Sequence, residues 1–193
     1  MLRFQRGNRV PVPSASPTAS WSAAAQPTYP PHTAEDWADL ARLPDWTGSW
    51  DPNVGDQNAQ IRTNMPPWRP EVAKQIARMI KEEQDGAPRG LFVDCLPEGM
   101  PSWMLVSHDA MEVLYTPGRV TLLGATDSNR MRRIYTDGRA LPKDPNPTWS
   151  GYSIGRWEKD VFVVESAGFN AKTWIDAIGH PHGERLRLTE RFR

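Results

Sequence analysis

Seven short segments with the composition of β-strands follow one another between residue 103 and the end of the chain, with no long helix between them. β-Branched and aromatic residues are frequent in each of them. Pro117-Gly118 and Lys159-Asp160 are predicted tight turns, and Asp137-Gly138 is typical of a hairpin. The predicted strands are Trp103 to Ser107, Met111 to Thr116, Arg119 to Ala125, Arg130 to Thr136, Tyr152 to Glu158, Val161 to Ser166 and Arg185 to Arg193. This order predicts a mainly β fold, in which an antiparallel meander forms a barrel or a sandwich.

The last predicted strand has the most regular alternation. Leu186, Leu188, Glu190 and Phe192 share one face, and arginines and Thr189 share the other. The Glu190 carboxyl group therefore points where the apolar side chains point, and there it must be paired, hydrogen-bonded or protonated. One interpretation is a buried ion pair with an arginine of a neighbouring strand, and the other is a general acid or base. The candidate arginines are Arg132, Arg133 and Arg156.

The chain ends inside this strand, with no turn or cap after Arg193. A strand at the edge of a sheet presents unpaired backbone groups, which another segment can cover. We therefore expect either a C-terminally truncated gene product or a partner that completes the sheet.

Length and charge narrow the class of protein. A chain of 193 residues fits one domain, and its one cysteine cannot form a disulfide within the chain. The 23 basic residues balance the 23 acidic ones, which argues against a general nucleic-acid binder. No apolar window reaches the roughly 18 residues of a membrane span, and no Gly-rich phosphate loop indicates a nucleotide cofactor.

The first 32 residues differ from the rest. They are rich in Pro, Ser and Ala and contain no acidic residue, which is typical of a disordered leader before a single domain at 33–193. A basic start followed by Ala23-Ala24-Ala25-Gln26 has the outline of an export signal. The segment between them is too polar for the apolar part of such a signal, so the sequence indicates plain disorder or a misassigned start codon more than a working signal.

Two helices are predicted ahead of the strands. Thr33-Ala-Glu-Asp36 resembles a capping pattern and opens a short helix that ends at Pro44. The second helix begins at Pro70 and ends before Gly86, with an apolar stripe from Val72 to Ile80. Such a stripe is typical of a helix packed on a core, so we expect the second helix to cover one end of the β structure.

The segment Asp176 to Glu184 brings two of the four histidines together with carboxylates. In an extended chain His180 and His182 face the same side, as in a metal site, but the spacing to the next Glu does not match a known metal motif, and we predict no metal. A proton-transfer site is another interpretation, in which His182 and Glu190 move a proton and Asp176 orients the imidazole. The third is a loop held by side-chain hydrogen bonds, with Asp176 as a cap.

The nine tryptophans suggest two kinds of role. Gly48-Ser49-Trp50 is the Gly-x-Trp pattern that opens the first strand of lipocalin-like barrels, where it closes the barrel floor. Together with the meander it predicts an antiparallel lipocalin-like barrel, complete or incomplete, with one or two short helices. Trp149, Trp157 and Trp174 stand near the ends of predicted elements, where either core packing or an aromatic ligand cavity would use them.

Several longer motifs resemble those of a family of uncharacterised bacterial proteins. They are Cys95-Leu-Pro-Glu-Gly-Met-Pro, Arg133-Ile-Tyr-Thr-Asp-Gly-Arg139, Asp144-Pro-Asn-Pro-Thr-Trp149, Ser153-Ile-Gly-Arg-Trp-Glu158, Val163-Val-Glu-Ser-Ala-Gly-Phe169 and Pro181-His182 to Glu190-Arg-Phe-Arg193. The resemblance covers about Trp46 to Arg193. It implies an exported or periplasmic protein whose relatives continue past Glu-Arg-Phe-Arg. This chain departs from it at Gly183, where Ser is usual, and at Lys159 to Phe162, where Gly-Asp-Thr-Leu is usual.

Three functions follow from these patterns. The first is a module that binds a small apolar or aromatic carboxylate, with Trp149, Trp157 and Trp174 lining a cavity and Arg133 or Arg156 neutralising the carboxylate. The second is a cofactor-free lyase, isomerase or hydrolase that uses the His182 and Glu190 pair with Asp176. The third is a subunit of a larger complex that docks through its open sheet edge. None of the three requires a cofactor, a nucleic acid or a membrane span.

Overall fold

The structure is a computed structural model that describes residues 32–53, 55, 63, 67–88, 93–105, 109–125, 130–175 and 180–193. His32–Arg193 forms a unit of its own, and the predicted leader at 1–31 lies outside the described residues. The described helices are α1 (Ala34–Leu40), α3 (Pro70–Gln84) and α4 (Ser102–Leu105). The strands are β1 (Gly48–Trp50), β2 (Met111–Thr116), β3 (Arg119–Gly124), β4 (Met131–Tyr135), β5 (Tyr152–Glu158), β6 (Val161–Ala167) and β7 (Arg187–Phe192).

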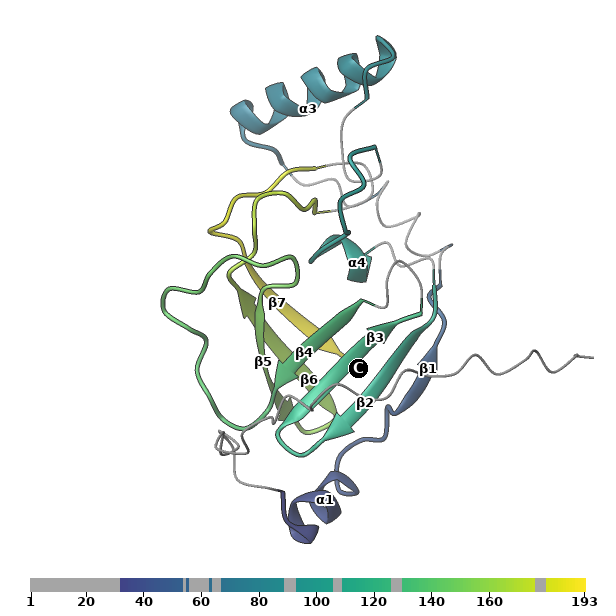
Figure 1. Ribbon diagram of the computed structural model, residues 1–193, viewed down its shortest axis with the longest axis vertical. Coiled ribbons are helices and arrows are strands. Elements are labelled where there is room, and N and C mark those ends of the chain that lie inside the picture. The colour runs from purple at the N-terminus through teal and green to yellow at the C-terminus, as the bar shows by residue number, and fades with distance from the viewer. Residues whose placement is uncertain are drawn as a thin grey trace, which may run out of the picture. The chain divides into compact units, whose positions relative to one another are not determined.

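The seven strands form one sheet in the order of the sequence, from β1 to β7 (Figure 1). All neighbouring pairs are antiparallel except β4 and β5, which are parallel and pair at Ile134 with Ser153 and at Tyr135 with Ile154. The prediction of a purely antiparallel meander was therefore wrong at this pair. The sheet is mixed and is not closed into a barrel, since β1 and β7 stand at its two ends. The mainly β class with few short helices is confirmed.

Turn chemistry explains which neighbours are antiparallel. Gly118, with φ +70°, turns β2 into β3, and Lys159, with φ +61°, turns β5 into β6, both as predicted. The predicted hairpin at Asp137-Gly138 does not form. Gly138 turns the chain at φ +81°, and the chain then runs through a proline-rich connection before β5. Because parallel neighbours need a long crossover rather than a tight turn, this connection is what makes β4 and β5 parallel.

The helices begin where their sequence signals predict, but α1 ends at Leu40, before the expected end at Pro44. Thr33 caps α1 with a complete capping box, in which the Thr33 hydroxyl oxygen accepts from Asp36 N at 3.1 Å and Thr33 N donates to Asp36 Oδ2 at 2.6 Å. Pro70 begins α3 as expected. None of the residues of α3 is buried, so the expected packing of its stripe over one end of the sheet is not seen. None of the described helices is long and apolar enough to cross a membrane.

One predicted strand is helical instead. Trp103 to Leu105 belongs to α4, and the rest of the predicted strand, 106–108, lies outside the described residues. Periodicity cannot distinguish a strand from a single helical turn over so short an apolar run. Trp103 N donates to Gly99 O at 2.9 Å, which begins this turn and buries the indole in the core.

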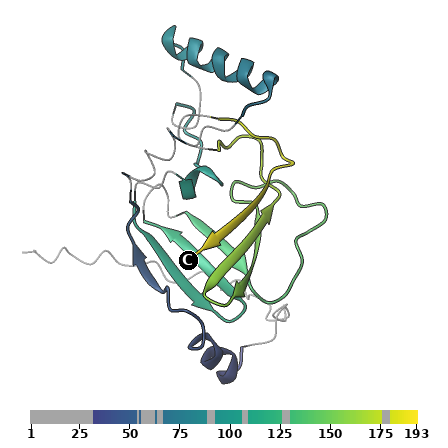
Figure 2. The same cartoon turned by 180° about the vertical axis from the view of Figure 1, so that it is seen from behind.

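The core lies against one face of the curled sheet. Its buried side chains come from β2, β3, β4 and β6, and Met100, Trp103 and Phe169 add to them from outside these strands. At one end of the sheet, the ring of Trp46 lies 5.0 Å from Trp157 and 6.5 Å from Phe192, centroid to centroid. Trp46 precedes β1 and Phe192 ends β7, so the two outer strands approach each other at this end (Figure 2).

The Gly-x-Trp pattern predicted that Trp50, and not Trp46, would close this end of the sheet. Gly48 to Trp50 does form the first strand, but the Trp50 side chain is 51% exposed. Its indole Nε1 donates to Trp46 O at 2.8 Å. Trp46, four residues earlier, is the tryptophan that packs between the outer strands.

Candidate functional site

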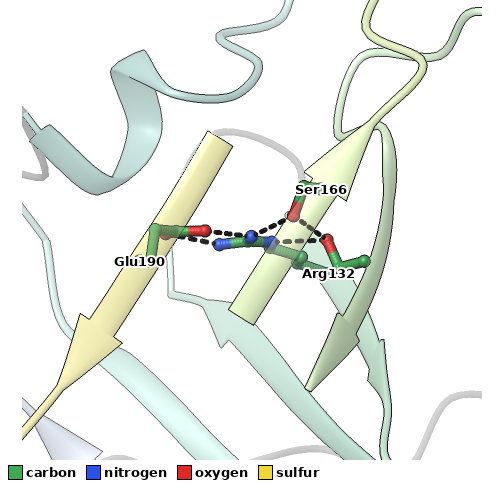
Figure 3. A network of polar contacts seen from close by, with 4 residues as sticks. Arg132, Ser166 and Glu190 are labelled. Carbon is green, nitrogen blue, oxygen red and sulfur yellow. Dashed lines mark hydrogen bonds and ion pairs between the residues drawn. The ribbon is translucent and has the colours of Figure 1, made fainter. Parts of the chain in front are cut away.

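Glu190 does point inward, and an arginine of β4 meets it there. Arg132, which is 1% exposed, donates from Nη1 to Glu190 Oε1 at 2.9 Å and from Nη2 to Glu190 Oε2 (Figure 3). The Arg132 side chain reaches Glu190 on β7 past two serines, Ser153 of β5 and Ser166 of β6. Of the three arginines that the sequence offered as partners, the structure selects Arg132.

The two serines complete the polar network. Arg132 Nε donates to Ser153 Oγ at 3.2 Å, and Nη2 donates to Ser166 Oγ at 3.0 Å. The two hydroxyl oxygens lie 2.8 Å apart, so one serine donates to the other. A bidentate guanidinium and carboxylate pair with these extra partners is the arrangement in which a buried ion pair is well satisfied. Each oxygen of Glu190 accepts a hydrogen bond from Arg132.

His182 lies in a different environment. Its Nε2 is 2.6 Å from Thr173 Oγ1, and its Nδ1 is 3.2 Å from the oxygen of Gly183. Since a carbonyl oxygen can only accept, Nδ1–H is the donor to Gly183. Burial lowers the pKa of His182 below its ordinary value of 6.5, and the hydrogen bond to Gly183 opposes this shift. The lowered pKa favours the neutral imidazole, and in the tautomer with its hydrogen on Nδ1 the Nε2 atom accepts from Thr173 Oγ1.

Thr173 was not singled out by the sequence. It is 1% exposed, and its hydroxyl also lies 3.2 Å from Met100 O, so its one hydrogen has two possible acceptors. His180 is buried, and its ring centroid lies 4.4 Å from that of Trp68. Its backbone oxygen accepts from Ile175 N at 2.8 Å. This part of the chain is tied to the core through Thr173 and Met100.

The two members of the predicted proton-transfer pair, His182 and Glu190, lie in separate environments. Glu190 is bonded to Arg132, and His182 is bonded to Thr173 and Gly183. Asp176, the third member of that prediction, lies outside the described residues. Among the residues that the structure describes, no group of three or more His, Cys, Asp or Glu is placed to hold a metal ion.

The two arginines predicted to neutralise a ligand lie on the outer face of the sheet. Arg133 follows Arg132 in β4 and is exposed, since neighbouring residues of a strand point to opposite faces. Arg156 of β5 is exposed and forms ion pairs with Glu158 at 2.9 Å and Glu165 at 2.6 Å. Neither side chain faces the interior.

The three predicted ligand tryptophans have separate surroundings. Trp157 stacks on Phe162 at 4.8 Å between ring centroids and belongs to the aromatic cluster of Trp46. Trp149 is half-buried, and its backbone oxygen accepts from Met100 N at 2.9 Å. Trp174 is half-buried beside an open groove of about 480 Å³.

Comparison adds no relative to these observations. The sequence matches no known protein-family model, and comparisons with curated proteins and with solved structures found no similar chain. The function proposed below therefore rests on the geometry of the described residues.

The groove beside Trp174 combines apolar and charged side chains. It is lined from α3 and from the segments around residues 94–96, 171–174 and 181. Trp174, Leu96 and Met79 supply apolar surface. Lys172 supplies an ammonium group that forms no ion pair with a residue in the described ranges. The sequence indicated Trp174 but not Lys172, because only the folded chain brings the lysine and α3 to one groove.

Proposed function

We propose that this chain is a small-molecule binding module whose ligand is an apolar or aromatic carboxylate. The observation that supports it is the groove of about 480 Å³ in which Trp174 and the Lys172 ammonium group lie together. Its volume is within the range of about 300–1,000 Å³ that small-molecule sites occupy. The paired state of Glu190 supports binding over catalysis, because this inward carboxylate already has a cation.

Each side of the groove has a part in this proposal. Trp174 offers a flat aromatic surface, and Leu96 and Met79 extend the apolar contact. Lys172 would pair with the ligand carboxylate as a point charge. Glu82 and Asp94 also line the groove, so a ligand with two anionic ends would meet repulsion there. We therefore expect preference for one carboxylate on an aromatic body.

The test uses 1-naphthoate as the probe and uncharged 1-naphthamide as its match. Titration of each into the full chain, followed by tryptophan fluorescence and calorimetry, should show naphthoate binding about fivefold or more tightly than naphthamide, as expected for a charge-assisted contact. Lys172→Gln should reduce this difference more than Arg78→Gln does, because Arg78 also lines the groove but already pairs with Glu82 at 3.9 Å. Trp174→Ala should weaken both probes. Lys159→Gln, in the turn between β5 and β6, is the matched control and should change neither affinity.

Two outcomes would contradict the proposal. One is equal affinity of the two probes for the unaltered chain. The other is a naphthoate preference that Lys159→Gln removes as effectively as Lys172→Gln, because the charge would then act from the whole surface and not from the groove.

A cofactor-free lyase, isomerase or hydrolase is the rival proposal. It would require Glu190 to leave Arg132 and its place opposite the two serines before it could exchange a proton with His182. Leaving the buried guanidinium of Arg132 without its partner is costly. The observation in its favour is the contact of 2.6 Å between His182 Nε2 and Thr173 Oγ1, since Thr173 also lines the groove. Its test is turnover of a library of esters and hydroxy acids that His182→Gln abolishes and Lys172→Gln does not.

We propose further that the curled sheet is of the lipocalin-like type and that the chain belongs to the bacterial family that its motifs resemble. Support for the sheet type comes from the approach of the two outer strands through Trp46 and Phe192. Support for the family comes from the Ser153 to Glu158 motif, which forms β5 and supplies both Ser153 to the ion-pair network and Gly155 to the core. A structure of a family member would test both statements.

A further inference from the structure

On its side away from β6, β7 approaches Trp46 at the Phe192 end and pairs with no other strand among the described residues. Within the described residues β7 pairs with β6 alone, and it ends the strand order. Such an edge presents a row of backbone donors and acceptors to any extended segment that can align with them. Figure 2 shows β7 as the outer strand beyond β6.

The outward face of this segment is strongly basic. Arg185, Arg187, Arg191 and Arg193 follow one another at even spacing, interrupted by Thr189, and all four are exposed. None of the four forms an ion pair with a residue in the described part of the chain. The whole chain has no net charge, so this row is a local concentration of positive charge on a single strand.

The inward face of β7 carries Leu188 and Phe192 on either side of the ion-paired Glu190, and it is only partly covered. Leu188 and Phe192 pack against the core as partly buried side chains. Their register partners on β6, Ser166 and Phe162, are buried, at 1% and 2% exposed. The inward side chains of β7 are therefore less buried than those of β6. A strand placed beside β7 would cover Leu188 and Phe192 with its own inward residues.

The charge of the row excludes two occupants. A second copy of β7 would place arginines opposite arginines on the same face, which is destabilising in a sheet. The first 31 residues of the chain contain no Asp or Glu, so their sequence provides no complement to the row. The occupant must carry acidic residues on one face and apolar residues on the other, which in a strand means alternation.

We propose that the β7 edge binds an extended acidic segment of another protein by strand addition. Its glutamates or aspartates lie opposite the arginine row, its apolar residues lie beside Leu188 and Phe192, and its backbone pairs with the open edge of β7. Main-chain bonds then supply affinity, and the alternating pattern supplies specificity. This surface is separate from the groove beside Trp174, and neither proposal depends on the other.

The probe is a labelled ten-residue peptide that alternates Glu and Val, titrated into the full chain by fluorescence anisotropy. We expect it to bind, and we expect a Lys and Val peptide of the same length not to bind. The double variant Arg187→Glu with Arg191→Glu should weaken binding by about tenfold or more, since it places like charges across the pair. The matched control Arg133→Glu, an exposed arginine of β4, should leave affinity within about twofold.

Backbone pairing has its own test. A Glu and Val peptide that is N-methylated at alternate residues keeps its charge but cannot form the ladder, and it should lose about tenfold in affinity or more. Hydrogen exchange of the β7 amides should slow when the unmodified peptide binds. Equal affinity for the methylated peptide, or equally tight binding of a single-stranded oligonucleotide, would overturn the proposal in favour of a purely electrostatic surface. So would a loss of affinity in Arg133→Glu as large as in the double variant.

Discussion

At the residue scale, the protonation of His182 is coupled to folding. The folded chain partly buries the His182 ring and places its Nε2 2.6 Å from the hydroxyl of Thr173, which is itself buried. Because desolvation disfavours the charged imidazolium, the pKa of His182 lies below 6.5 in the folded chain. The unfolded chain restores the ordinary value, so the two states bind different numbers of protons at mildly acidic pH.

This difference predicts how stability varies with pH. Below about pH 6.5 the unfolded chain binds more protons at His182 than the folded chain does, so the free energy of unfolding should fall as the pH falls. The contribution is fully present above that pH. His182→Gln should reduce the dependence between about pH 7.5 and 5.5, as measured by urea unfolding. Gln84→Asn, at an exposed position without an ionisable group, is the control and should leave the dependence unchanged.

A direct titration of the His182 ring tests whether its pKa is lowered in the folded chain. An NMR titration of the His182 ring in the folded chain should give a midpoint below 6.5. A midpoint at or above that value would mean that the hydrogen bond to Gly183 outweighs burial.

At the element scale, the packing of β5 depends on Gly155, because side chains of the neighbouring strands occupy the space that a Cβ would need. A Cβ on Gly155 would lie 2.5 Å from Phe162 Cζ and 2.9 Å from Ile134 Cγ2. Phe162 lies on β6 and Ile134 on β4, the two neighbours of β5. The absence of a side chain at Gly155 thus lets the strands on both sides pack over β5.

Gly155→Ala should therefore destabilise the fold. The added methyl group forces Phe162 and Ile134 apart, and over-packing of this kind costs about 1–3 kcal/mol in the free energy of unfolding. Gly183→Ala is the matched control, because a Cβ there meets no atom within 4 Å, and it should change stability by about 0.5 kcal/mol or less. Equal destabilisation of the two variants in urea unfolding would refute this account of β5.

At the scale of the whole molecule, the Arg132 and Glu190 pair links strands that are not neighbours. Arg132 lies on β4 and Glu190 on β7, with β5 and β6 between them in the sheet. A bond between these strands requires the sheet to curl, and the small serines at 153 and 166 leave room for the arginine to pass. The pair therefore lies in the interior of the sheet and can form only because the sheet is curled.

Breaking this pair should be costly, and replacing it should not. Glu190→Gln leaves a buried guanidinium without its counter-charge and should lower the free energy of unfolding by about 3 kcal/mol or more. The double variant Arg132→Met with Glu190→Leu should recover most of that loss, because apolar side chains of similar size pack well in such places. Arg156→Gln, which removes an exposed arginine with two carboxylate partners, should cost less than about 1 kcal/mol. Similar losses in Glu190→Gln and Arg156→Gln would show that the inner pair is not buried in solution.

Local sequence patterns by themselves determined most of the strands, both tested helix starts and the inward direction of Glu190. These follow from side-chain alternation, capping and turn chemistry, which act between residues a few positions apart. The tertiary structure alone decided that Arg132 and not Arg133 meets Glu190, that β4 and β5 are parallel, and that Trp46 and not Trp50 joins the outer strands. Each of these depends on the register and order of strands far apart in the chain, which local periodicity does not encode.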